Sequence, residues 1–115
     1  AIFEIMQNGK KGESYNIGGN NELDNNTLVR YICEILDELY PSRLNNNSNC
    51  LRYAELIKYV SDRAGHDFRY SINSNKLSSN LNWKPKTDFM NGLKKTVKWY
   101  LDNEDWVNNS FLNND

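Results

Sequence analysis

The segment Val60–Tyr70, VSDRAGHDFRY, contains the residues of this chain whose types and spacing suit chemistry. It sets an aspartate–arginine pair, a glycine and the chain's one histidine between apolar residues that alternate as in a β-strand. The planar guanidinium of Arg63 matches the oxygens of a phosphate, and Gly65 removes a side chain that would hold a ligand away from the backbone. The segment is therefore a candidate anion-binding turn. A plain surface turn in which Asp62 pairs with Arg63 explains the same residues equally well.

Other catalytic arrangements lack their partners in this sequence. His66 combines on paper with an aspartate and a serine into a triad, but no Gly-x-Ser-x-Gly motif presents a nucleophile. Asp62 and Asp67 flank the turn, yet such a carboxylate pair is too common to indicate acid–base catalysis. Cys33 and Cys50 form no Cys-x-x-Cys motif, which argues against a zinc site or a disulfide framework. We predict no catalytic and no metal-binding residue.

Motifs that hold a nucleotide cofactor are also missing. Neither Gly-x-Gly-x-x-Gly nor Gly-x-x-x-x-Gly-Lys-Ser/Thr occurs, and Gly18-Gly19 alone make no dinucleotide cradle. No tyrosine is followed four residues later by a lysine, the spacing that lowers a phenol's pKa for hydride transfer. We therefore predict no cofactor-binding residue in this chain.

Length and charge limit the class of protein. With 115 residues, the chain is one domain or part of a larger one. Its 14 Lys and Arg balance 15 Asp and Glu, so no net charge favours nucleic acid or a membrane surface as a partner. No apolar run approaches the roughly 20 residues that span a bilayer, and the first residues lack a signal-peptide pattern. We expect a soluble, cytoplasmic protein.

The residue patterns predict a small α/β unit with few short strands and three main helices. The predicted order is a helix remnant over 1–12, a strand over 13–19, a helix over 27–39, strands over 55–60 and 68–72, a short helix over 75–81 and a long helix from 89. Because the chain begins inside a helical pattern, an N-terminal part is expected to be missing. The strands are too few for a complete doubly wound sheet.

Residue types also predict how the helices begin and end. Asn26 or Thr27 is the expected N-cap of the helix over 27–39, and Ser74 and Asp88 are the expected caps of the two later helices. Asn82 is expected to take the left-handed conformation that ends the short helix. The tryptophans are assigned to core or interface packing; they are Trp83, Trp99 and Trp106.

Four segments carry a resemblance to a known family. They are GKKGESYNIGGNNE, ICEILDELYP, YVSDRAGHDFRYSINSNKLSSNLNWKP and GLKKTVKWYLDN. In this order they resemble the C-terminal part of the dTDP-glucose 4,6-dehydratases, which belong to the extended short-chain dehydrogenase/reductases. The similarity runs from Ala1 to about Asn108, and the combination of YNIGG with DR-x-GHD-x-RY points to this family among the sugar-nucleotide enzymes.

The resemblance implies a division of labour. In that family an N-terminal Rossmann domain holds NAD and the catalytic residues, and a smaller C-terminal domain binds the nucleotide-sugar. Residues 1–115 would be that substrate-binding domain without the Rossmann domain. The implied reaction is oxidation at C4, loss of water across C5 and C6, and return of the hydride to C6. The implied partners are a dTDP-sugar, the missing Rossmann domain and, for the full enzyme, a second copy in a homodimer.

The resemblance also implies which residues bind substrate. They are Asn25, Asp62, Arg63, Ala64, Gly65 and His66. Arg63 would pair with the pyrophosphate, Gly65 would permit close approach, and Asp62 and His66 would orient the loop or the ligand by hydrogen bonds.

The chain departs from the family pattern at three places. Ala64 stands where the family usually has proline, the asparagine-rich segment around 45–49 looks longer than usual, and Asn82 replaces a glycine.

Three functions are compatible with these observations. The first function is the substrate-binding portion of an NAD-dependent dTDP-glucose 4,6-dehydratase, not catalytic alone. The second is the same domain of another nucleotide-sugar epimerase, decarboxylase or dehydratase. The third is a non-catalytic interaction module left by truncation.

Overall fold

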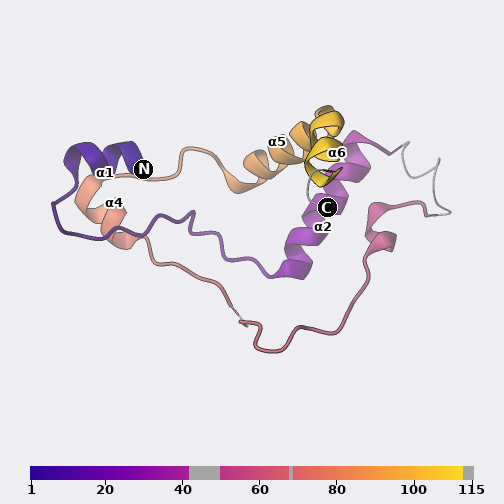
Figure 1. Cartoon of the computed structure of the whole chain (residues 1–115), viewed down its shortest axis with the longest axis horizontal. Coiled ribbons are helices and arrows are strands. Elements are labelled where there is room, and N and C mark those ends of the chain that lie inside the picture. Colours follow the sequence, from indigo (N-terminus) through magenta and orange to yellow (C-terminus); the bar gives the residue numbers. More distant parts are fainter. Residues whose placement is uncertain (42–49, 68, 113–115) are drawn as a thin grey trace. The chain divides into compact units, whose positions relative to one another are not determined.

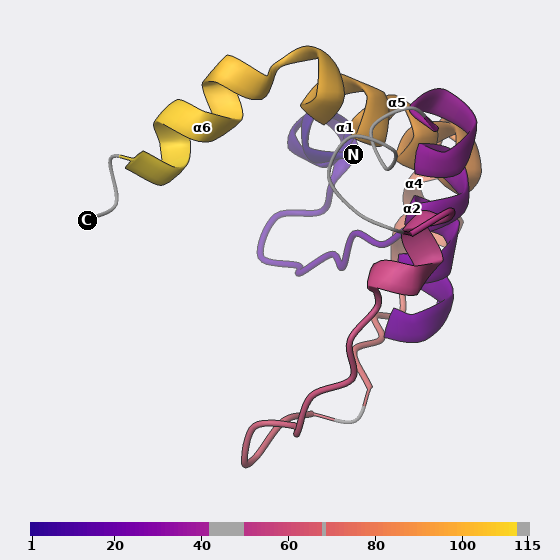
Figure 2. The same cartoon turned by 90° about the vertical axis from the view of Figure 1, so that its right-hand side faces the viewer.

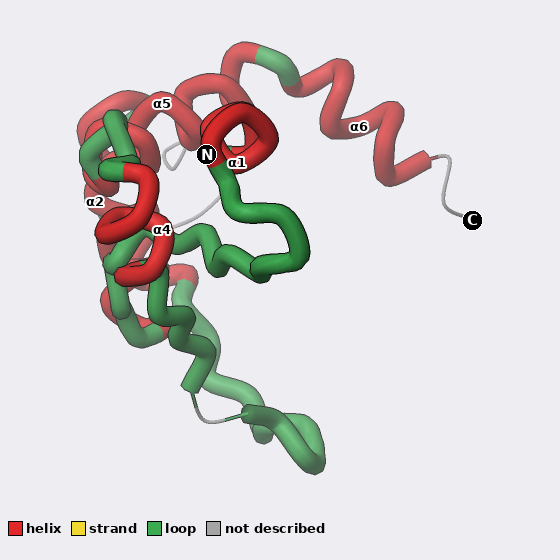
Figure 3. Tube along the Cα trace, turned by 90° about the vertical axis from the view of Figure 1, so that its left-hand side faces the viewer, coloured by secondary structure: helices red, strands yellow, loops and turns green. Residues whose placement is uncertain are grey.

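The computed structural model describes residues 1–41, 50–67 and 69–112. Within these ranges the chain forms five α-helices and one 3-10 helix and no strand (Figures 1 and 3). The elements are α1 (Ile2–Asn8), α2 (Asn25–Leu39), η1 (Tyr53–Leu56), α4 (Asn75–Leu81), α5 (Phe89–Asp102) and α6 (Glu104–Leu112). The chain divides into two compact units. The first unit comprises Ala1–Glu22 and Ser61–Phe89, and the second comprises Leu23–Val60 and Met90–Asp115.

In the first unit, α1 packs against α4 (Figure 1). Leu77 of α4 is fully buried and forms the centre of this unit's core. The predicted N-terminal helix is confirmed, but it ends at Asn8 rather than near Gly12. The backbone becomes extended at Gly9, with φ −71° and ψ 146°, after the Gly9 N–H makes the last helical hydrogen bond, to the Ile5 carbonyl at 2.8 Å. A Cβ at Gly9 would lie 2.4 Å from that carbonyl oxygen, so a glycine lets the chain leave the helix here.

The short helix α4 follows the prediction closely. Ser74 occupies its N-cap position, and Asn82 ends it in the left-handed conformation with φ 52° and ψ 27°. Asparagine tolerates this conformation better than other residues with a Cβ. The Ser74 hydroxyl does not cap the helix; it donates to Oδ1 of Asn20 at 2.9 Å.

The predicted strands are not confirmed. Residues 13–19 and 69–72 are loop, and of residues 55–60 the first two belong to η1 and the rest are loop. Phe68, the first residue of one predicted strand, lies outside the described residues. A strand is stable only when a neighbour completes its backbone ladder, and no recorded backbone hydrogen bond joins two of these segments within the described ranges. The expected α/β unit is therefore helical in the part that the structure describes.

In the second unit, α2 begins two residues earlier than predicted, and the predicted caps Asn26 and Thr27 are wrong. Asp24 is the N-cap: its Oδ1 accepts from the Thr27 backbone N–H at 2.9 Å and its Oδ2 from the Thr27 hydroxyl at 2.6 Å. A carboxylate satisfies two donors at once, which neither predicted residue can do from within the first turn. These hydrogen bonds lower the pKa of Asp24.

The core of the second unit joins α2, η1 and α5. Cys33 and Ile35 of α2 and Val97 of α5 are buried. The start of η1 is fixed to α2 because the Tyr53 backbone N–H donates to Oδ1 of Asp37 at 2.9 Å. The Tyr53 hydroxyl donates to the Tyr40 carbonyl at 3.0 Å, next to the end of α2.

The helix α6 was not predicted as a separate element. Figure 2 shows α6 following α5. The two helices are separated by a break at Asn103, whose side-chain amide donates to the Trp99 carbonyl at 2.8 Å. Trp99 and Trp106 lie on either side of the break with ring centroids 5.1 Å apart and an interplanar angle of 70°. They are 44% and 56% exposed, so these two rings pack on each other at the surface rather than in the core, whereas Trp83 is half-buried. None of the described helices is long and apolar enough to cross a membrane.

Candidate anion-binding turn

Residues Asp62–His66, called here the 62–66 turn, contain a type II β-turn. The His66 backbone N–H donates to the Arg63 carbonyl at 3.3 Å. Gly65, at the third position, has φ +71°, whereas Ala64, at the second position, does not have positive φ. This combination defines type II, which requires a residue with positive φ at its third position and favours proline at its second. The geometry explains Gly65 and identifies Ala64 as a site suited to proline.

Asp62 holds the turn from its first residue. Its Oδ1 accepts from the Arg63 backbone N–H at 2.8 Å and lies 2.7 Å from Nδ1 of His66. The hydrogen bond from His66 is the main cause that lowers the pKa of the Asp62 carboxyl. The Asp62 side chain is 72% exposed and the His66 side chain 28% exposed. The carboxylate therefore pairs with the imidazole, and the surface pairing of Asp62 with the Arg63 side chain is not formed.

Arg63 is exposed, and its guanidinium has no hydrogen-bond or ion-pair partner among the residues that the structure describes. The space beside Gly65 is open as well, since a Cβ built there would meet no heavy atom within 4 Å. A cation with free donors next to accessible backbone is an arrangement that suits a phosphate oxygen.

The structure brings five of the six predicted substrate-binding residues together, Asp62, Arg63, Ala64, Gly65 and His66, in one turn of the first unit. The sixth, Asn25, is the first residue of α2 and belongs to the second unit.

One group of the first unit was missed from the sequence. Glu22 forms an ion pair with Arg69 through Oε2, and its Oε1 accepts from the Ser71 hydroxyl at 2.5 Å. A signal was available: Arg69 and Ser71 are two residues apart and share one face of an extended segment. Such a pair predicts a shared acidic partner. Which carboxylate that is depends on which distant segment of the chain lies beside residues 69–71.

The described residues do not fit a dinucleotide cofactor. A Cβ at Gly18 would lie 2.6 Å from Cγ2 of Ile72, so the space that this glycine leaves is filled by protein. Gly18-Gly19 are followed by loop rather than directly by a helix N-terminus, which a pyrophosphate cradle needs. No group of three His, Cys, Asp or Glu side chains that could hold a metal occurs in the described part of the chain.

The second unit contains a cavity of about 390 Å³ beside α2 and η1. Its lining includes Arg30, Cys33, Asp37 and Arg52, and the last two form an ion pair with Nε and Oδ2 3.5 Å apart. Burial raises the pKa of the Cys33 thiol, so this sulfur is kept protonated. Because Asp37 and Arg52 pair with each other and the Cys33 thiol is protonated, these three groups do not form a reactive centre.

Comparison with known proteins shows the family of the chain. The model of the GDP-mannose 4,6 dehydratase family matches residues 1–96. The chain is 47% identical over 109 residues to the dTDP-glucose 4,6-dehydratase of Shigella flexneri and 48% identical over 109 residues to that of Salmonella typhimurium. These matches cover 95% of this chain and 28% of each relative. The resemblance seen in the sequence is thus confirmed, and the chain spans less than a third of the relatives' length.

A solved structure gives the same result. The dTDP-glucose 4,6-dehydratase of Bacillus anthracis, in complex with NAD, superposes with a TM-score of 0.71 at 39% sequence identity. The match covers 91% of this chain and 29% of that one. Since the family model spans most of the chain and the structural match covers nearly all of it, the chain belongs to the GDP-mannose 4,6 dehydratase family.

Proposed function

We propose that this chain is the C-terminal, nucleotide-sugar-binding portion of an NAD-dependent dTDP-glucose 4,6-dehydratase and is not catalytic alone. The complete enzyme would convert dTDP-glucose to dTDP-4-keto-6-deoxyglucose. Asn25 and the 62–66 turn are the proposed substrate-binding residues.

The observation that carries this proposal is the free guanidinium of Arg63 on a locked turn. Because Asp62 is occupied by His66, it does not neutralise Arg63, and the five N–H donors of the guanidinium stay available for diphosphate oxygens. Gly65 leaves the backbone open to the same ligand. Identity of 47% with the Shigella flexneri dehydratase supports dTDP-glucose as the substrate.

Calorimetric titration of the chain with dTDP tests the binding role. Arg63→Ala is expected to weaken binding about tenfold or more, since a hydrogen-bonded charged group is lost. Arg30→Ala is the matched control: it removes another exposed arginine, from α2 in the second unit, and should leave the affinity unchanged. Equal affinities for the parent chain and Arg63→Ala would refute the proposal. If the chain is stably folded and monomeric but does not bind dTDP, the result would favour a non-catalytic interaction module instead.

A second assay tests the division of labour. The chain is incubated with dTDP-glucose and NAD, with and without a separately produced Rossmann half of a related dehydratase. We expect the 4-keto-6-deoxy product only when both halves are present. Turnover by this chain alone would show that it carries catalytic residues.

NAD enters the proposal through the rest of the enzyme. The solved Bacillus anthracis relative is in complex with NAD, and the described residues here offer no cradle for it. We therefore assign the cofactor, which supplies hydride transfer, to the part of the enzyme outside this chain. A homodimer of the complete enzyme belongs to the same proposal. The free thiols of Cys33 and Cys50 support a reducing, cytoplasmic location.

A second substrate has one observation in its favour. The matching family model is named for GDP-mannose 4,6 dehydratase rather than for a dTDP-sugar enzyme. Competition of GDP and UDP against dTDP, measured on the same chain, separates these substrates. Tighter binding of GDP would replace dTDP-glucose with GDP-mannose in the proposal and leave the role of Arg63 unchanged.

A further inference from the structure

Two segments of the first unit, residues 13–22 and 69–76, lie antiparallel and are called here the paired segments. From Glu13 through Asn16 to Glu22, the partner residues run from Lys76 through Asn73 to Arg69, whereas Asn20, which accepts from the Ser74 hydroxyl, departs from this order. Between these ends the Asn16 amide donates to the Asn73 carbonyl at 3.3 Å. Side chains hold the pair, since no recorded backbone hydrogen bond joins the two within the described residues.

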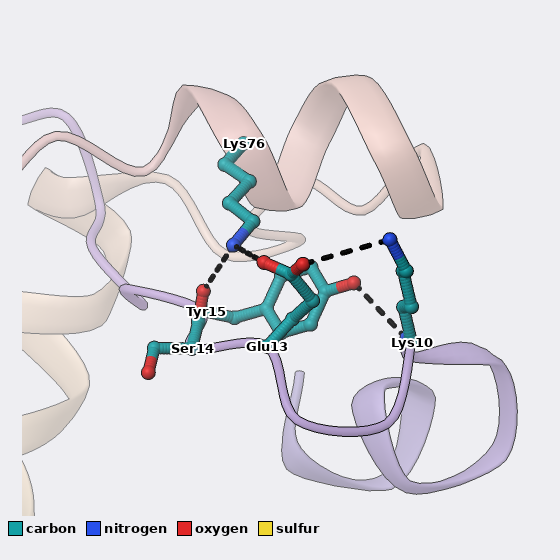
Figure 4. A network of polar contacts seen from close by, with 5 residues as sticks. All are labelled: Lys10, Glu13, Ser14, Tyr15 and Lys76. Atoms are coloured by element: carbon teal, nitrogen blue, oxygen red, sulfur yellow. Dashed lines mark hydrogen bonds and ion pairs between the residues drawn. The ribbon is translucent and has the colours of Figure 1, made fainter.

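The far end of the paired segments is fixed by Lys76 (Figure 4). Its Nζ donates to Oε2 of Glu13 at 2.8 Å and to the Ser14 carbonyl at 2.7 Å, and it lies 4.8 Å from the centre of the Tyr15 ring. Lys10 approaches the same Glu13 carboxylate at 3.7 Å. These contacts lower the pKa of Glu13, with the hydrogen bond from Lys76 as the largest cause.

The near end is fixed by Glu22. Its two carboxylate oxygens take separate partners, Arg69 and Ser71, and so hold the chain at two points of an extended segment. Arg69 lies three residues after His66, so this is the first recorded side-chain anchor beyond the 62–66 turn among the described residues. Residues 69–72 also line an open hollow of about 400 Å³.

We infer that Glu22 is a positioning residue for the 62–66 turn. It touches no part of the turn itself and acts through Arg69 and Ser71, whose anchoring limits the positions open to the turn and to the Arg63 guanidinium. Glu22 also neutralises Arg69, so that Arg63 remains the unpaired arginine of this segment. The link to ligand binding rests on the proposed function, whereas the anchoring of the turn does not.

Amide hydrogen exchange tests the anchoring. In Glu22→Gln, exchange at the Arg63 and His66 amides should rise about threefold, the size expected for losing an exposed ion pair. Exchange at Leu77 and Ser78, whose amides bond to the Ser74 carbonyl at 3.1 and 3.3 Å, should not change. Glu13→Gln makes the same chemical change at the far end and should leave the turn unaffected. The double exchange of Glu22→Arg with Arg69→Glu restores the ion pair but leaves the Ser71 hydroxyl without its acceptor, so it should restore part of the protection.

The outcomes separate this inference from the proposed function. Unchanged exchange at Arg63 and His66 in Glu22→Gln, or no protection regained at these amides in the charge-exchanged pair, overturns the inference. A uniform rise that includes Leu77 and Ser78 also overturns it, since that means general loosening. In dTDP titrations, Glu22→Gln should weaken binding about threefold in the parent and not at all in Arg63→Ala. If the parent does not bind dTDP, the proposed function fails, and the exchange results alone decide the anchoring.

Discussion

Nδ1 of His66 lies 2.7 Å from Oδ1 of Asp62, so the chain's one histidine closes its own turn rather than facing a metal or a nucleophile. The same oxygen accepts the Arg63 backbone N–H, which makes Asp62 the centre of the turn. The turn is thereby locked without using the Arg63 side chain.

Replacing His66 with alanine should raise the pKa of Asp62 toward its ordinary value, because the hydrogen bond from His66 is the main cause of the lowering. A carboxyl with a depressed pKa adds stability above its unfolded pKa and loses it as the pH falls through its folded pKa. Below about pH 4 the parent should therefore lose more stability than His66→Ala. Carboxyl ¹³C titration measures the pKa, and Asp24, held low by Thr27, is the internal control. An unchanged titration of Asp62 would contradict this account.

Ala64→Pro should stabilise the chain by about 0.4–1 kcal/mol. Ala64 is the second residue of a type II turn, where the fixed φ of proline fits and removes freedom from the unfolded chain. Gly65→Ala should have the opposite effect and cost about 1–2 kcal/mol, because φ at Gly65 is +71°. Urea unfolding measures both changes. Destabilisation by Ala64→Pro would mean that the turn is not type II.

Asp24→Ala should cost about 1 kcal/mol of unfolding free energy, because the two hydrogen bonds from Thr27 to the N-cap carboxylate are lost. Asn26→Ala is the control, since Asn26 is an exposed residue inside α2 and should change stability by less than about 0.5 kcal/mol. If Asp24→Ala and Asn26→Ala lose equal amounts of unfolding free energy, Asn26 caps α2 as well, as its residue type first suggested.

Leu77→Ala should be the most destabilising of these changes, by about 2–5 kcal/mol, because Leu77 is 0% exposed and its removal leaves a cavity. Leu51→Ala deletes the same atoms from a side chain that is 82% exposed and should change stability by less than about 0.5 kcal/mol. Thermal unfolding followed by circular dichroism compares the two. Similar midpoints would show that Leu77 does not anchor the first unit's core.

Helices that carry their own signals were the predictable part of this fold. The recurrence of apolar residues located α2 and α5, and Asn82 was correctly placed in the left-handed conformation because that preference is local. The N-cap of α2 was misplaced by two or three residues, since DNNT offers several capping side chains and only geometry shows which one reaches Thr27.

Features that depend on distant partners were less predictable. Alternation in 13–19 and 68–72 predicted strands, but a strand also needs backbone partners, and the paired segments are joined by side chains. The turn was identified by its residue types. That His66 rather than Arg63 is the partner of Asp62 depended on the positive φ of Gly65, which reverses the chain and brings His66 near Asp62. Glu22 was missed because its partners are 47 and 49 residues away.

The pair of indole rings that spans the break between α5 and α6 provides an optical probe of that joint. Trp99 and Trp106 are close enough, at 5.1 Å between centroids, for their excited states to couple, and the 70° angle between their planes gives the coupling a chiral signature in near-ultraviolet circular dichroism. Straightening the chain at Asn103 would separate the rings and remove this signal. The coupled rings are therefore a label-free reporter of the break between α5 and α6.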